Sequence, residues 1–214
     1  MHFEFLVEGQ TELTALSIIM PKVLGEYDVE HTWVIHKHRG IGRLPEDFDA
    51  RPDPHNATLL HQLPFKIKAY EKSDRPDLRV IVLLDLDDKD EHVFMNELQA
   101  IKDDFCQRLD VVFTLAKEEL EAWYLGDREA LLEYNPDIDL AVLDQYEQDS
   151  ICGTWEVLAR ADDPNVAKSK KRGPLVSNLK KKWSKGISPK MNVAANNSPS
   201  FNDFIDSVVN NEVG

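Results

Sequence analysis

The sequence has only two cysteines, Cys106 and Cys152, and they lie far apart. Neither belongs to a CxxC or CxxH pair, so we expect no disulfide framework, no zinc site and a reducing, cytoplasmic location. No apolar run approaches the roughly 20 residues of a membrane-spanning helix. The N-terminus also lacks the charged-then-apolar pattern of a secretion signal. These absences favour a globular protein without a membrane partner.

Positive charge is scarce overall, and the formal net charge is −14. Such a charge argues against a general nucleic-acid-binding protein. The positive charge is, however, concentrated: nine Lys or Arg residues and no acidic residue lie between Lys168 and Lys190. Separate acidic and basic parts suit a protein that holds metal ions in one place and phosphates in another. A solvated basic helix on an acidic protein would give the same pattern.

The apolar pattern predicts alternating strands and helices. Strands are expected at 2–7, 31–36, 80–84 and 110–116, and helices at 11–24, 57–71 and 91–108. The continuously aliphatic run 80–84 is typical of a central parallel strand that is covered on both faces. The alternation predicts an α/β fold with a mostly parallel sheet flanked by helices. We place this domain at residues 1–126, followed by a helical C-terminal extension at 127–214 that contains the basic segment 168–190 and a terminal helix capped by Ser198 or Ser200.

Acidic residues follow three of the expected strands, at the edge where open α/β sheets bind ligands. They are Glu8 and Glu12 after the first strand, Asp85 and Asp87 at the end of the central strand, and Glu118, Glu119 and Glu121 after the last strand. Adjacent parallel strands would bring these carboxylates together, and the carboxylates would repel one another unless a cation is bound. Clustered carboxylate oxygens suit Mg²⁺ or Mn²⁺, and two such ions can promote phosphodiester hydrolysis.

Each acid also has an ordinary structural explanation. Glu12 would stabilise a helix N-terminus by its charge alone, and an Asp-x-Asp sequence at a strand end is often part of a turn. Asp85 and Asp87 point to the same side only if the chain stays extended. The choice among the three glutamates after the last strand depends on where the next helix begins. Only the combination at neighbouring strand ends favours a metal site.

Two motifs, VEGQTE (7–12) and LLDLDD (83–88), resemble the TOPRIM fold, the metal-binding catalytic domain of topoisomerases, primases and overcoming-lysogenisation-defect nucleases. The segment AKEELEAWYLGDREAL (116–131) resembles a family of small, uncharacterised bacterial TOPRIM-like proteins with a Glu-Leu-Glu-Ala-Trp signature. HRGIGRLP and NNSPSFNDF are also similar to that family, so the resemblance spans nearly the whole chain. The chain departs from the TOPRIM pattern in two places: no Gly directly follows the aspartate pair, and Glu12 stands where several branches have Asp.

The resemblance implies a TOPRIM-like (Rossmann-like) domain with metal ligands at Glu8, Glu12, Asp85, Asp87, Glu119 and Glu121. In such a domain, Glu8 would be a metal ligand or the general base, and Glu119 and Glu121 would complete a second ion site. Catalysis would depend on Glu8, Asp85 and a lysine near the scissile phosphate, for which we choose Lys190 and keep Lys180 and Lys171 as alternatives. Phosphate contacts are expected from Lys170, Lys171, Arg172, Lys180, Lys181 and Lys182.

The expected activity is that of a Mg²⁺- or Mn²⁺-dependent endonuclease with DNA as its substrate. The resemblance further implies a role in bacterial defence against phage or plasmids together with an ATPase partner, and self-association is left open. One alternative is a non-catalytic TOPRIM-like toxin or sensor subunit that acts through a partner. Another is a nucleotide-sugar glycosyltransferase with a metal-binding DxD motif, although that activity would not explain Glu8 and Glu12.

Overall fold

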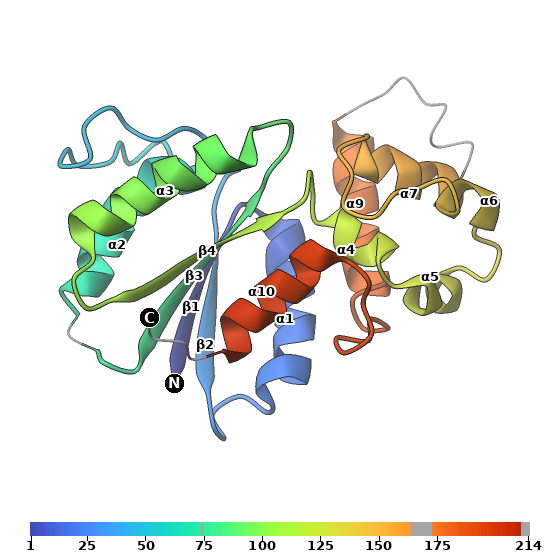
Figure 1. The fold of residues 1–214 in the computed structure, drawn as a ribbon, viewed down its shortest axis with the longest axis horizontal. Coiled ribbons are helices and arrows are strands. Elements are labelled where there is room, and N and C mark those ends of the chain that lie inside the picture. The colour runs from blue at the N-terminus through green and yellow to red at the C-terminus, as the bar shows by residue number, and fades with distance from the viewer. Residues whose placement is uncertain (74, 164–172, 211–214) are drawn as a thin grey trace.

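The computed structural model of the protein describes residues 1–73, 75–163 and 173–210. Its centre is a four-stranded sheet in the order β2-β1-β3-β4. The strands are β1 (His2–Val7), β2 (Thr32–Lys37), β3 (Leu78–Asp85) and β4 (Asp110–Ala116), and every pairing is parallel. The predicted α/β class with a Rossmann-like parallel sheet is therefore confirmed (Figure 1).

Helices cover both faces of this sheet. Helices α2 (Leu59–Glu71) and α3 (Glu91–Phe105) lie on one face, and α1 (Gln10–Leu24) and α10 (Pro199–Val209) lie on the other (Figure 1). Because side chains alternate along a strand, Leu6 packs towards α2 and α3 while Phe5 and Val7 pack towards α1 and α10. All residues of β3 before its last one are buried, as expected for a central strand covered on both faces.

The remaining helices follow β4 and gather on one side of the sheet (Figure 1). They are α4 (Glu121–Leu125), α5 (Arg128–Tyr134), α6 (Leu140–Leu143), α7 (Thr154–Asp162) and α9 (Pro174–Gly186). Trp123 of α4 is fully buried, with its ring 5.2 Å from that of Phe201 and 4.9 Å from that of Phe204. Phe204 in turn lies 6.3 Å from Phe5 of β1. One hydrophobic core thus continues from the sheet into the helical extension, and the boundary at residue 126 stays a prediction.

The terminal helix α10 begins at Ser198, one of the two predicted caps. The Ser198 hydroxyl accepts a hydrogen bond from the backbone N–H of Phe201 (3.2 Å), and Pro199 occupies the first helical position. Asp149, in the loop before α7, accepts hydrogen bonds from the Ser198 hydroxyl (2.8 Å) and the Ser200 N–H (2.7 Å). These contacts fix the start of α10 to the extension.

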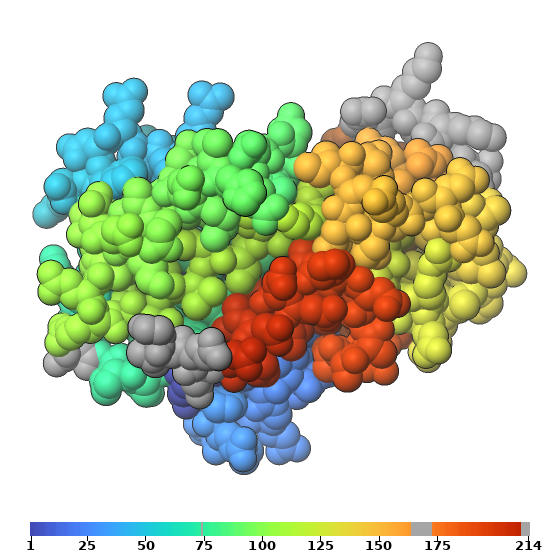
Figure 2. All heavy atoms as spheres, viewed as in Figure 1, coloured from blue at the N-terminus to red at the C-terminus, as the bar shows by residue number. Residues whose placement is uncertain are grey.

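The surface view shows the extension as a lobe beside the α2–α3 layer, with α10 lying across the visible face near their junction (Figure 2). Among the helices within the described ranges, none combines the length and the apolar character needed to cross a bilayer. The hydrophobic residues instead form two buried clusters, one on each side of the sheet.

Candidate functional site

Five of the predicted acids lie at the carboxyl edge of the sheet, where β1, β3 and β4 end beside one another. They are Glu8, Glu12, Asp85, Glu119 and Glu121. The ends of β1 and β3 are joined directly, because the Glu8 carboxylate accepts a hydrogen bond from the backbone N–H of Asp85 (2.8 Å). We call these five residues the acidic cluster.

Glu12 belongs to this cluster rather than to the solvated end of α1. Its side chain lies in the first turn of α1, yet the residue is only 9% exposed. A charge that served only the helix dipole would not need burial, which is costly for a carboxylate. The approach depends on Gly9, since a Cβ atom at residue 9 would lie 3.2 Å from Glu12 Oε2. Gly9 thus leaves the space into which Glu12 folds back.

The three glutamates that follow β4 differ in position, and only two of them belong to the acidic cluster. Helix α4 begins at Glu121, and Glu118 has a left-handed backbone (φ 58°). The Glu118 carboxylate accepts hydrogen bonds from the N–H groups of Gly153 (2.8 Å) and Thr154 (2.8 Å), and it also contacts the Thr154 hydroxyl. Glu118 is therefore the cap of α7, whereas Glu119 and Glu121 remain for the cluster.

A lysine from α9 reaches the cluster. Lys180 Nζ lies 2.8 Å from Glu119 Oε1 and 3.0 Å from Glu121 Oε2. The Glu121 side chain is 1% exposed. Within the described part of the chain, Glu121 Oε1 and Glu119 Oε2 are buried without a hydrogen-bond donor. Two buried carboxylate oxygens are thus available as ligands even when Lys180 is in place.

Burial and mutual repulsion make the cluster electrostatically unfavourable without a cation. Burial raises the pKa of Glu8 to about 7, and the negative charges of Glu12 and Asp87 act in the same direction. Burial also raises the pKa of Glu119 to about 7 and the pKa of Asp85 well above its usual range. Among the described residues, Lys180 contacts Glu119 and Glu121 and the charge of Lys89 acts on Glu8, so the five carboxylates outnumber the ammonium groups near them.

The pKa of Lys180 reflects the same excess of negative charge. Burial lowers the pKa of this lysine, but the negative charges of Glu121, Glu119 and Asp85 outweigh burial and hold the pKa above its usual range. Lys180 therefore stays protonated at neutral pH. Its positive charge balances part of the negative charge of the carboxylates.

The donor set suits a hard divalent cation such as Mg²⁺ or Mn²⁺, because all its ligand atoms are carboxylate oxygens. The side chains do not already converge on one point: in residues 1–73, 75–163 and 173–210, no group of three Asp, Glu, His or Cys residues is arranged as a ready metal site. An ion would therefore bind with rotation of these side chains. Lys180 would be its competitor for Glu119 and Glu121.

Asp87 does not lie beside Asp85 in the way an extended chain would place it. Strand β3 ends at Asp85, and Asp87 has a left-handed backbone (φ 51°). The Asp87 side chain is 48% exposed and lies 3.1 Å from Lys89 Nζ. The condition for a shared face is thus not met; the charge of Asp87 acts on Glu8, and its backbone N–H donates a hydrogen bond to the Glu118 carbonyl (2.9 Å).

Lys190 also lies away from the cluster. Its Nζ is 3.7 Å from Glu133 Oε2, and the preceding Pro189 carbonyl accepts a hydrogen bond from Lys22 in the last turn of α1. Glu12 lies in the first turn of the same helix, ten residues or about 15 Å away. The lysine that the structure brings to the acids is Lys180.

The predicted phosphate-binding residues are only partly placed. Lys181 and Lys182 are exposed on α9, and Lys182 Nζ lies 3.7 Å from Asp162 Oδ2. Lys180 is held by the acidic cluster. Lys170, Lys171 and Arg172 lie outside the described residues. The described basic surface beside the cluster is thus the outer face of α9.

A pocket of about 450 Å³ opens next to the acidic cluster. It is lined by Thr11, Glu119, Trp155, Gly173, Val176, Ser177 and Lys180. Glu119 and Lys180 belong both to this pocket and to the cluster, so a molecule bound in the pocket would contact the acids. Trp155 was not among the predicted site residues, because no sequence signal separates a pocket-lining tryptophan from one in the core.

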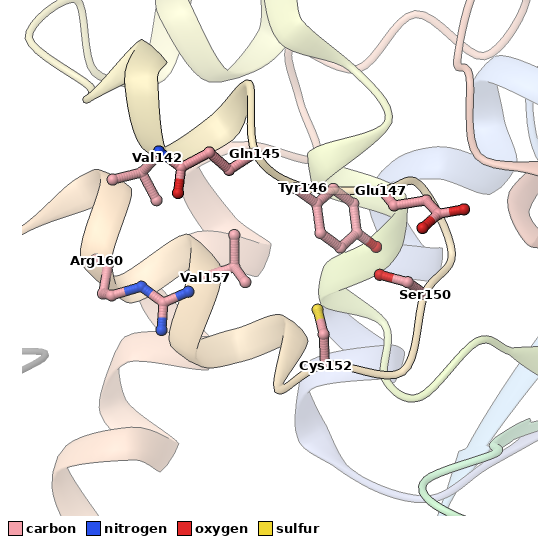
Figure 3. A pocket seen from close by; sticks show the side chains of 8 residues that line it. All are labelled: Val142, Gln145, Tyr146, Glu147, Ser150, Cys152, Val157 and Arg160. Atoms are coloured by element: carbon pink, nitrogen blue, oxygen red, sulfur yellow. The ribbon is translucent and has the colours of Figure 1, made fainter.

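The extension contains a second pocket of about 410 Å³, lined by Val142, Gln145, Tyr146, Glu147, Ser150, Cys152, Val157 and Arg160. The Tyr146 ring and the Cys152 thiol lie on one side and Arg160 of α7 on the other (Figure 3). None of the predicted catalytic or metal-binding residues lines it. Of these two pockets, only the first is lined by predicted site residues, namely Glu119 and Lys180.

Comparisons with known proteins place the chain in a family. No curated protein and no solved structure matched the chain. A family described as "Domain of unknown function (DUF4276)" matches residues 7–208. The match includes all five residues of the acidic cluster, Lys180 and nearly all of α10. The chain belongs to the DUF4276 family.

Proposed function

We propose that the protein is a divalent-metal-dependent nuclease of the TOPRIM type, which hydrolyses phosphodiester bonds of DNA. The observation that carries the proposal is that five carboxylates lie near one another at the carboxyl edge of a parallel sheet, two of them with buried oxygens that lack a hydrogen-bond donor. A cluster of this charge is costly to bury, and a bound cation removes that cost. Mg²⁺ or Mn²⁺ matches its oxygen donors.

The residues divide into two roles. Glu8, Glu12, Asp85, Glu119 and Glu121 would hold the ion or ions. The chemistry that such an ion supplies when bound is polarisation of the phosphate and activation of water. Glu8, whose carboxylate accepts a hydrogen bond from the Asp85 N–H, would serve either as a ligand of the ion or as the base that accepts the proton of the attacking water.

Lys180 supports phosphoryl chemistry in a different way. Its ammonium is fixed beside the acids by Glu119 and Glu121. A cation at this position would stabilise the negative charge that develops on the phosphate oxygens. The exposed Lys181, next in sequence on α9, would neutralise a neighbouring phosphate and add sequence-independent affinity.

The biological setting that we propose comes from the TOPRIM resemblance. It consists of bacterial defence against phage or plasmids, in the cytoplasm and together with an ATPase partner. The proposal leaves self-association open.

One observation favours a second candidate, a non-catalytic subunit that acts through its partner. Lys180 already neutralises part of the charge of Glu119 and Glu121. A protein that never bound metal would stabilise its acids in this way. The two candidates differ in whether Mn²⁺ binds at the cluster.

The test is DNA cleavage by the purified full chain with Mg²⁺ or Mn²⁺, on plasmid and on single-stranded DNA. Glu8→Gln and Asp85→Asn are expected to lower the rate by about 10²- to 10⁴-fold. The matched control Glu133→Gln, which changes an exposed carboxylate that pairs with Lys190, should cleave like the wild type. Equal cleavage by the wild type and Glu8→Gln would overturn the nuclease proposal. Absence of both cleavage and Mn²⁺ binding would favour the partner subunit.

A further inference from the structure

The pocket beside the acidic cluster combines an aromatic wall with polar groups. Trp155 is partly exposed and shares the pocket with the aliphatic side chain of Val176. Thr11 and Ser177, which carry hydroxyl groups, also line this pocket. This combination of an aromatic surface with a few hydrogen-bonding groups is typical of a site for a flat heterocycle.

Trp155 is held in a fixed relation to the acids. It is the second residue of α7, whose first turn is capped by the Glu118 carboxylate through the Gly153 and Thr154 N–H groups. Glu118 directly precedes Glu119 in the chain. One short backbone segment therefore positions both an acid of the cluster and, through the cap, the tryptophan.

The other tryptophans of the chain do not offer such a surface. Trp123 and Trp183 are fully buried, and the Trp183 indole donates a hydrogen bond to Asp162 Oδ2 (2.9 Å). Trp33 is on β2, with its ring 5.1 Å from that of Tyr27. Trp155 is the tryptophan that lies at the pocket next to the catalytic acids.

We propose that this pocket binds one unstacked nucleobase of the substrate strand, with Trp155 as the stacking surface. The inference rests on the proposed nuclease function and defines its substrate class. With a base on Trp155, the adjoining backbone phosphate lies towards Lys180 and Glu119, which line the same pocket. A base inside a duplex is covered by its neighbours and cannot stack on a protein side chain without leaving the helix. The substrate is therefore a single strand, or a duplex region whose base has been displaced.

The proposal is tested by binding in EDTA, which stops any metal-dependent cleavage. Fluorescence anisotropy would compare a labelled single-stranded DNA with a labelled hairpin duplex of the same length. Trp155→Ala is expected to weaken single-strand binding by about 5- to 150-fold, the range for loss of one base–aromatic stack. Trp155→Phe, which keeps an aromatic face, should stay within about threefold of the wild type. Trp33→Ala is the matched control and should bind as the wild type does.

Three results would overturn the proposal. The first is that Trp155→Ala binds the single strand as tightly as the wild type does. The second is that Trp155→Ala loses as much affinity for the duplex as for the single strand. The third is that the wild type does not bind the single strand at concentrations up to about 100 µM. Thermal unfolding of each variant shows whether it is folded, and Trp155→Phe keeps the test valid if the alanine variant is not. Failure here would leave Glu8-dependent cleavage intact, whereas failure of the nuclease proposal would be seen as cleavage that does not depend on Glu8.

Discussion

Lys180 Nζ lies 3.0 Å from Glu121 Oε2, and the Glu121 side chain is 1% exposed. A buried carboxylate with a single ammonium partner loses several kcal/mol of stabilisation when that partner is removed. The same carboxylate belongs to a cluster that suits a divalent cation. Under the proposed metal binding, this contact would link the stability of the metal-free protein to its affinity for the ion.

Replacing Lys180 by Met is expected to destabilise the metal-free protein by about 3–5 kcal/mol, because the buried acids lose their cation. Mn²⁺ should recover much of this loss, since the ion then has no competitor for Glu119 and Glu121. Urea unfolding in EDTA and in Mn²⁺ measures both effects. The control Lys185→Met changes an exposed lysine of the same helix and should stay within about 0.5 kcal/mol of the wild type. Wild-type stability of Lys180→Met in EDTA would contradict the prediction.

The raised pKa of Glu8 predicts a pH dependence of stability. Between the ordinary value of 4.5 and about 7, the folded protein holds a proton on Glu8 that the unfolded chain has released. The contribution of Glu8 to the free energy of unfolding therefore falls as the pH rises through this window, by roughly 3 kcal/mol in total. Glu8→Gln removes the titrating group. Measured in EDTA, the stability of Glu8→Gln relative to the wild type should therefore increase from pH 4.5 to pH 8. A difference in stability that does not change with pH would contradict a pKa raised by burial.

Glu118 should show the opposite pH dependence. Burial alone would raise its pKa, but hydrogen bonds from Thr154, Gly153 and Cys152 outweigh burial and hold the pKa below the usual value. Its contribution to stability is therefore present above pH 4.5 and is lost as the pH falls through the lowered pKa. Glu118→Gln is expected to cost about 1–3 kcal/mol at pH 7. The cost should shrink in acid, as measured by urea unfolding at several pH values, and a pH-independent cost would argue against the cap.

Gly9→Ala is expected to weaken metal binding more than it weakens the fold. Its new Cβ would lie 3.2 Å from Glu12 Oε2, so the carboxylate must shift by a few tenths of an ångström from its place in the cluster. We expect Mn²⁺ affinity, measured by calorimetry, to fall about 10-fold or more. Glu12→Gln should have a similar effect, because it removes the charge that Gly9→Ala displaces. Wild-type Mn²⁺ affinity in Glu12→Gln would show that Glu12 is not a ligand.

The fold followed from local patterns in the sequence. The expected strand at 80–84 lies within β3, and the expected helix at 11–24 differs from α1 by one residue at its start. Both segments carry an unambiguous apolar period, and the parallel alternation of strands and helices leaves few arrangements for the sheet. The same reasoning brought Glu8, Asp85 and Glu121 to one edge, because strand ends are set by the sheet.

Prediction and structure differ where the position of a residue depends on the backbone conformation of a single residue or on contacts distant in sequence. Asp87 leaves the line of β3 because its own backbone is left-handed, which a DxD pattern does not show. The position of Lys180 among the acids depends on the packing of α9 against α1. Lys190 looks equivalent in the sequence, but the turn after α9 takes it to Glu133.

The aromatic stack of Trp123 on Phe201 and Phe204 also sets the order in which the site can form. Trp123 lies two residues after Glu121 in α4, and its packing partners are contributed by α10. During synthesis the acids of β1, β3 and β4 leave the ribosome well before residues 199–209. Until those residues emerge, the Trp123 ring lacks the two aromatic rings against which it packs. The nascent chain would therefore carry its acids before Trp123 is fully packed, and the helix that holds Glu121 would gain its final packing only once α10 has docked.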